Sequence, residues 1–295
     1  MAFPLEAVPN FSEGRNRATI DAIGLALSGH ARLLDVHTDV DHNRSVFTIV
    51  GQEDELLEGL LAGIARARER IDLQAHEGAH PRVGVADIVP IVGVRPEDME
   101  RARAAALVLA RRVGEELGLP VFLYGELGAA RGPAFLRSGG PSELQRRIDA
   151  GELTPDRGPT RLDPSAGAVL VGARRPLIAF NVNLGTEDVE VARAIAAVVR
   201  ERGGGFPGVR ALGLALPSCE IVQVSMNIED PEAVDLHEVV ARVRAEADAR
   251  GVETRGSELV GLLPAGSAAV AARDALGLAD LDASRLLEVR VLDGA

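Results

Sequence analysis

The spacing of apolar and polar residues along the chain predicts a mixed order of strands and helices. Short apolar runs with strand character alternate with longer segments whose apolar residues recur every three to four positions, as on one face of a helix. The first part predicts strand, helix, strand, strand, helix, strand, then one more helix and strand, over residues 5–9, 15–27, 31–38, 45–51, 53–71, 83–94, 96–117 and 121–126.

Residues 126–165 interrupt this order. They are rich in Gly, Pro and Arg and show little periodicity beyond a helix predicted over 142–149, which is typical of a linker or lid. The order then begins again, with strand character in 168–184, a helix over 187–202, strands over 209–216 and 220–228, a helix over 231–249, a strand over 257–264 and a helix over 265–276.

The repeated order strand, helix, strand, strand, helix, strand is typical of the split βαβ, ferredoxin-like arrangement. We therefore expect an α+β protein with two ferredoxin-like subdomains, residues 1–165 (including the linker 126–165) and 166–295. Each subdomain covers one sheet face with its own helices, so we expect the bare faces to pack together. The ligand is expected in a cleft between the two sheets, since clefts at domain interfaces are common ligand sites.

Composition narrows the function classes. The chain of 295 residues has a formal net charge of −12, no lysine, no tryptophan and one tyrosine. Nucleic acids and anionic membranes require a broad basic face, so we expect neither as a partner. The single Cys219 excludes an internal disulfide. A signal peptide begins with basic residues, whereas the first basic residue of this chain is Arg15, so no signal peptide is predicted. The longest uncharged run, 259–272, is too short to span a bilayer, so a cytoplasmic location is predicted.

The histidines supply the first candidate chemistry. HEGAH at 76–80 matches the zinc pattern H-E-x-x-H, which needs both histidines on one face of a helix. Gly78 and Pro81 argue against a helix there, so we predict no metal site. His80 then lies in a rigid loop before a buried strand, where a fixed general base or an ordinary turn residue is expected.

Two polar segments leave alternatives open. The segment 35–44 is either a hard-cation site or a solvated hairpin loop, and its polar residues are Asp35, His37, Asp39, Asp41, His42 and Arg44. Near the N-terminus, Ser12 is expected to cap the first helix, and the backbone N–H groups after it either bind an anion or serve only the cap.

Several long motifs resemble the formiminotransferase domain of the glutamate formimidoyltransferase family. They are VPNFSEGRN, LLDVHTDVDHNRSVFTIVG, GAHPRVGVADIVPIVGV, YGE, GARRPLIAFNVNL and GSELVGLLP. The resemblance covers both halves, from about Leu5 to Pro264, and stops short of a cyclodeaminase domain. It implies two similar α/β subdomains with the ligand between them, and transfer of a formimidoyl group from N-formimidoyl-L-glutamate to tetrahydrofolate in histidine degradation. A homodimer is also expected.

The resemblance also implies site residues. The catalytic histidine of the family falls on His80, and His37 receives no essential role. The folate-contacting stretch falls on Gly172, Ala173, Arg174, Arg175, Pro176, Leu177, Ile178, Ala179, Phe180 and Asn181.

The implied reaction sets further requirements. The folate amine loses a proton and the glutamate amine gains one, and one histidine suits both transfers. The two carboxylates of glutamate favour arginine partners, for which Arg82 and Arg44 are the candidates near His80, with Asn10 and the backbone after Ser12 as further anion ligands. Asp39 and Asp87 are the candidates to stabilise the cationic amidine. The alternatives are a formyltransferase that uses N-formylglutamate and a non-catalytic folate- or amino-acid-binding protein.

Overall fold

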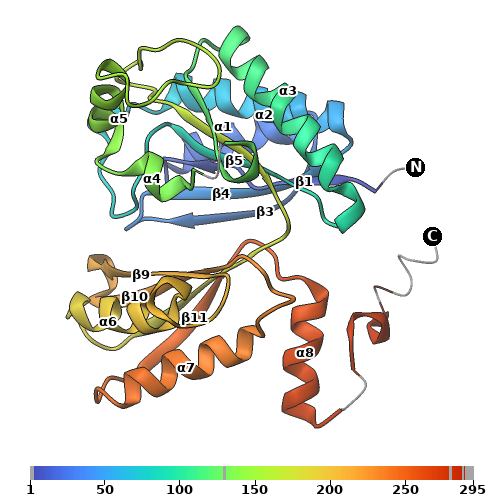
Figure 1. Ribbon diagram of the computed structural model, residues 1–295, viewed down its shortest axis with the longest axis vertical. Helices are drawn as coiled ribbons and strands as arrows, with labels where there is room; N and C mark the ends of the chain where they lie inside the picture. The colour runs from blue at the N-terminus through green and yellow to red at the C-terminus, as the bar shows by residue number, and fades with distance from the viewer. Residues whose placement is uncertain (1–2, 129–130, 279–280, 288, 290–295) are drawn as a thin grey trace. The chain divides into compact units, whose positions relative to one another are not determined.

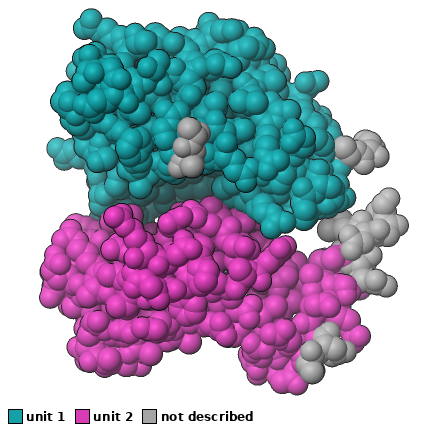
Figure 2. Space-filling view, viewed as in Figure 1, with its two compact units in different colours: residues 1–175 teal, residues 176–295 magenta. Residues whose placement is uncertain are grey.

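The chain folds into two compact units, residues 1–175 and 176–295 (Figure 2). The computed structural model describes residues 3–128, 131–278, 281–287 and 289. Each unit has its own sheet and hydrophobic core, and the predicted α+β class is confirmed. The division lies after Arg175 and not after residue 165 as predicted, because the strand Val169–Arg174 (β7) pairs with two strands of the first unit.

The first unit contains a seven-stranded sheet in the order β3-β4-β1/β2-β5-β7-β6. Besides β7, its strands are β1 (Leu5–Ala7), β2 (Asn10–Phe11), β3 (Arg32–Asp39), β4 (Arg44–Gly51), β5 (Ala86–Val92) and β6 (Val121–Leu123). Both β1 and β2 lie between β4 and β5, so together they occupy one strand position. β1 lies within the strand predicted over 5–9, whereas β2 follows it. The break contains Pro9, which has no N–H to donate to a neighbouring strand. β5, β7 and β6 are parallel, and the other pairs are antiparallel.

Three long helices pack their apolar residues into the main core of this unit: α1 (Arg17–Ser28), α2 (Glu53–Arg70) and α3 (Met99–Glu116) (Figure 1). α2 has acidic residues in its first turn and arginines in its last, as the helix dipole favours. α1 corrects one expectation, because its cap is Asn16, whose side chain accepts from the Thr19 N–H. Ser12 instead donates to the carbonyl of Gly84 at 2.8 Å.

The segment predicted as a linker or lid is a folded layer. It contains α4 (Pro133–Arg137) and α5 (Gly140–Asp149), and four of its leucines are buried in a second hydrophobic cluster with strand residues. This cluster contains Leu136, Leu144, Leu153 and Leu162 together with Phe122, Tyr124 and Leu170. Alternate residues of a strand face opposite sides of a sheet. Since Val121 and Leu123 lie in the main core, β6 is covered on both faces.

The second unit contains a four-stranded antiparallel sheet in the order β11-β8-β10-β9. Its elements are β8 (Ile178–Leu184), α6 (Val189–Val199), β9 (Val209–Leu216), β10 (Ile221–Ile228), α7 (Leu236–Asp248), β11 (Thr254–Val260) and α8 (Ala265–Leu276). α6 and α7 pack on the face that carries Val182, Val222 and Val224. Asn181, Asn183 and Gln223 alternate with these valines and therefore project from the other face.

Among the helices in the described ranges, none combines the length and the apolar composition needed to cross a bilayer.

Candidate active site

Three segments of the first unit meet around His80: the loop after β2, the turn between β3 and β4, and the loop before β5. Asn43 in the turn joins all three. Its Oδ1 accepts from the Gly14 N–H at 2.9 Å, and its Nδ2 donates to the Glu77 carbonyl at 2.8 Å. The Ala79 N–H adds a bond to the Asp41 carbonyl at 3.0 Å. Segments far apart in the sequence thus form one hydrogen-bonded platform.

Two glycines allow these segments to approach. A Cβ atom on Gly14 would lie 2.1 Å from the Asp39 carbonyl oxygen, and one on Gly78 would lie 2.4 Å from that of His42. Real Cβ atoms do not approach backbone atoms so closely. The glycines in the motifs SEG and HEGAH are therefore required by close backbone packing.

The absence of an α-helix over residues 76–82 was predicted and is confirmed. Arg82 holds this loop through hydrogen bonds to its backbone. The Arg82 Nη2 donates to the carbonyls of Gly78 at 2.7 Å and His80 at 2.6 Å, and its Nη1 contacts the His76 Nδ1. The other ring nitrogen of His76 lies 3.1 Å from the Asn43 carbonyl. His76 and His80 therefore do not form the helical pair of a zinc protease, and the guanidinium of Arg82, expected at a substrate carboxylate, contacts the loop.

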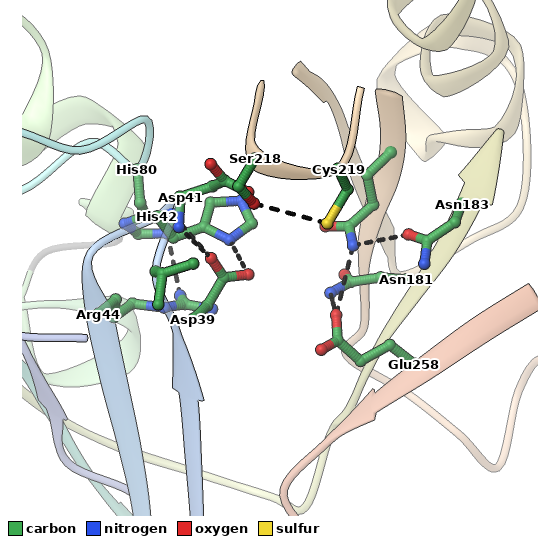
Figure 3. Close-up of polar contacts among 12 residues, drawn as sticks. Asp39, Asp41, His42, Arg44, His80, Asn181, Asn183, Ser218, Cys219 and Glu258 are labelled. Atoms are coloured by element: carbon green, nitrogen blue, oxygen red, sulfur yellow. Dashed lines mark hydrogen bonds and ion pairs between the residues drawn. The ribbon is translucent and has the colours of Figure 1, made fainter. Parts of the chain in front are cut away.

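His80 is a partly exposed imidazole whose Nε2 lies 3.0 Å from the Arg44 Nη1 (Figure 3). The same guanidinium nitrogen lies 3.4 Å from the Asn10 Oδ1. A guanidinium only donates, so Nε2 is the unprotonated acceptor. Burial, followed by the positive charges of Arg44 and Arg137, holds the pKa of His80 well below its usual value. At neutral pH the imidazole is therefore neutral, and Arg44 holds its lone pair.

Besides Arg44 and Arg82, Arg137 of α4 is a further cation near His80, and it was not among the residues predicted from the sequence. Its Nη2 donates to the carboxylate of Asp87, a buried residue of β5 that also accepts from the Val83 N–H at 2.7 Å. The arginine content of the segment 126–165 was the only sequence signal. Asp87 was a candidate partner for the cationic amidine, and the structure gives it Arg137 as its partner instead.

Asp39 and His42 form a close pair within the β3–β4 turn. The Asp39 Oδ2 lies 2.5 Å from the His42 Nδ1, and its Oδ1 accepts from the N–H groups of Asp41 and His42 (Figure 3). Burial acts to raise the pKa of Asp39, but the hydrogen bonds and charge of His42 outweigh it and lower that pKa to about 2. Asp39 is thus ionised and bound to His42. In the sequence, His42 was one of several polar residues in a segment predicted to be either a cation site or a solvated loop.

The backbone amides after Ser12, considered as an anion site, have partners within the protein. The N–H groups of Arg15 and Asn16 both donate to the Glu13 Oε1 at 2.8 Å, and Gly14 donates to Asn43. These contacts correct the anion-site interpretation, because the donors already have acceptors.

The expected folate stretch crosses the division between the units. Gly172 and Ala173 are buried in β7, where a Cβ on Gly172 would lie 2.6 Å from the Tyr124 ring. Arg174 is half-buried and Arg175 is exposed. The remaining residues lead into β8, where Asn181 is buried.

A polar cluster surrounds Asn181 on the sheet of the second unit (Figure 3). The Asn181 Nδ2 donates to the Glu258 Oε2 at 3.0 Å. The Gln223 Nε2 donates to the Asn183 Oδ1 at 2.9 Å and lies 3.3 Å from the same Glu258 oxygen. Glu258 and Gln223 could not be predicted from the sequence, because only the strand register places them opposite Asn181 and Asn183.

Replacing Asn43 with alanine should destabilise the platform. The change removes two hydrogen bonds that join three segments, so we expect a loss of about 2–3 kcal/mol in unfolding free energy, measured by urea denaturation. Asn43→Asp keeps the acceptor for Gly14 and should lose less. Equal stability of Asn43→Ala and the native protein would contradict this role.

Comparison with known proteins decides the family. The profile of the N-terminal subdomain of the formiminotransferase domain matches residues 4–174, and that of the formiminotransferase domain matches residues 179–276. This chain belongs to the formiminotransferase family. It is 39% identical to a glutamate formimidoyltransferase of Streptococcus pyogenes, over 90% of each chain, and 39% identical to one of Thermoplasma acidophilum, over 96% of each. It is 41% identical to the formimidoyltransferase-cyclodeaminase of Rattus norvegicus, over 88% of this chain and 50% of the rat protein.

Proposed function

We propose that this protein transfers the formimidoyl group of N-formimidoyl-L-glutamate to tetrahydrofolate, giving 5-formimidoyltetrahydrofolate and L-glutamate, in histidine degradation. The observation that carries the proposal is the similarity over 90% or more of the chain to proteins named for this reaction. The neutral imidazole of His80 among arginines supports it, because the reaction needs a base and an anionic donor needs cations.

His80 acts as the general base and acid in this proposal, and Arg44 controls it. A carboxylate of the donor takes over the Arg44 guanidinium, which frees the His80 Nε2 lone pair. Nε2 then takes the proton of the folate N5 as N5 attacks the amidine carbon. Asn10, whose side chain lies near Arg44, is a further residue that would bind the donor. Direct contacts of the donor with Arg82 and Asp39 are less favoured, because both side chains bind other groups of the protein.

We propose that both units have the ferredoxin-like topology and that both contribute to substrate binding. The strand order β11-β8-β10-β9, with α6 and α7 as crossovers, supports the first point for the second unit. Folate would contact the stretch Gly172–Asn181, with the amide of Asn181, oriented by Glu258, at the polar edge of the pterin. The location of the ligands between the two sheets stays a prediction, as do the homodimer and the cytoplasmic location.

If both units bind folate, the separate pieces 1–175 and 176–295 should each bind tetrahydrofolate at least about tenfold more weakly than the whole chain, because each loses part of the contacts. Isothermal titration on pieces whose circular dichroism shows a fold would measure this. A first piece that binds as tightly as the whole chain would contradict the shared site.

The direct test is incubation of the purified protein with tetrahydrofolate and N-formimidoyl-L-glutamate, with the modified folate identified by mass. The proposed chemistry uses no metal, so the same rate is expected after exhaustive chelation. Tight folate binding without any product would favour a non-catalytic binding protein.

A further inference from the structure

The Asp39–His42 pair has no task in a mechanism that relies on His80 alone. His42 is 2% exposed, and its Nδ1 lies 2.5 Å from the Asp39 carboxylate. A carboxylate that binds one nitrogen of an imidazole fixes the ring and presents the other nitrogen for proton transfer, as in several families of hydrolases. The Asp39–His42 pair therefore has the geometry of a proton-transfer group.

The second ring nitrogen of His42 is the unusual atom. Since Asp39 is ionised and only accepts, the His42 Nδ1 carries a proton, and Nε2 is the nitrogen left for exchange. Within the part of the chain that the structure describes, this Nε2 is buried and has no hydrogen-bond partner. Buried polar atoms without partners are uncommon in folded proteins, and each calls for an explanation such as a catalytic role.

His42 and His80 are neighbours in opposite electrostatic surroundings. Their ring centroids are 6.1 Å apart, with the ring planes at 80°. The charged side chain bound to His42 is the Asp39 carboxylate, whereas Arg44, Arg137 and Arg82 act on His80. Two titratable groups placed in opposite fields are how one site provides both a base and an acid at one pH. The arginines favour the neutral base form of His80, whereas the charged partner of His42 is a carboxylate.

We propose that His42, held by Asp39, is a second catalytic residue that donates the proton to the departing glutamate nitrogen, while His80 takes the proton of the folate N5. The proposal rests on the proposed function. The bond from N5 to the amidine carbon forms as N5 loses its proton to His80. The bond from that carbon to the glutamate nitrogen breaks as this nitrogen gains a proton from His42. One proton then returns from His80 to His42 through water, which closes the cycle without any oxidant or reductant.

The test is the pH dependence of kcat for the full chain with both substrates saturating. A base and a separate acid give a profile that falls at both ends. His42→Asn keeps a donor near Asp39 and removes Nε2, so kcat should fall by about 10–100-fold and the alkaline limb should disappear. Asp39→Asn removes the charged partner that orients the His42 ring, so its kcat should also fall. His30→Asn, at an exposed position after α1, is the matched control and should behave like the native protein.

A His42→Asn protein with kcat within threefold of native, or with lower kcat and an intact alkaline limb, would overturn the proposal. The second result would mark a positioning role only. Thermal melting of each variant separates these results from loss of the fold. The proposed function fails separately, if the native protein makes no modified folate from N-formimidoyl-L-glutamate.

Discussion

Replacing His80 with alanine should lower kcat by at least about a hundredfold, because the folate N5 then attacks the amidine carbon without a base to take its proton. The dissociation constant of tetrahydrofolate should stay nearly unchanged, since the change removes a proton-transfer group and leaves the folate contacts in place. Steady-state kinetics and isothermal titration on the same preparation measure both quantities.

The fold should tolerate this change. The loop around His80 is held by its backbone carbonyl, which accepts from Arg82, and by the bonds of Asn43, neither of which needs the imidazole. His30→Ala, at an exposed histidine, is the matched control and should leave kcat unchanged. A His80→Ala protein with a native melting temperature and kcat within a few fold of native would refute the assignment.

Replacing Arg44 with methionine should raise KM for N-formimidoyl-L-glutamate by about 10–100-fold, the range expected from loss of a charge-assisted hydrogen bond.

The same replacement should also change the pH profile of kcat/KM. The positive charge of Arg44 disfavours the imidazolium form of His80, so its removal raises the pKa of His80. Since the neutral imidazole is the active base, kcat/KM falls as the pH drops through this pKa. The midpoint of the acid limb should therefore lie below the usual histidine range in the native protein and move to higher pH in the variant.

The control for Arg44 is Arg66→Met, which removes a charge from a half-exposed pair with Glu69 on α2. Both variants change the net charge equally, so a difference between them reports the local role of Arg44. An unchanged acid limb in Arg44→Met would show that this arginine does not govern the protonation of His80.

The sequence predicted most elements well where apolar periodicity was strong. The helix predicted over 53–71 is α2, and the predicted strands 31–38 and 45–51 are β3 and β4. Expectations failed where pairing across the sheet decides the structure. Periodicity could not show that β7 belongs to the first unit, since only its bonds to β5 and β6 place it there.

The candidate site was only partly predictable, for a similar reason. His80 and Arg44 stood out through their motifs, and the structure brings their side chains into contact. The importance of Asn43 and Arg137 comes from hydrogen bonds to residues 29 and 50 positions away in the chain. No local pattern reports such contacts. The apolar residues of the arginine-rich segment 126–165 are irregularly spaced and form no periodic pattern, so the packing of this segment on the sheet was not predicted.

The most direct measurement compares two donors in one experiment. The purified protein is supplied with tetrahydrofolate and equal concentrations of N-formimidoyl-L-glutamate and N-formyl-L-glutamate, and the folate products are separated and quantified. A cationic amidine is already electrophilic, whereas a neutral formamide needs donors for an oxyanion, and the site around His80 offers a neutral base. The account predicts 5-formimidoyltetrahydrofolate as the main product, formed together with an equal amount of glutamate. Formyltetrahydrofolate as the main product would contradict it.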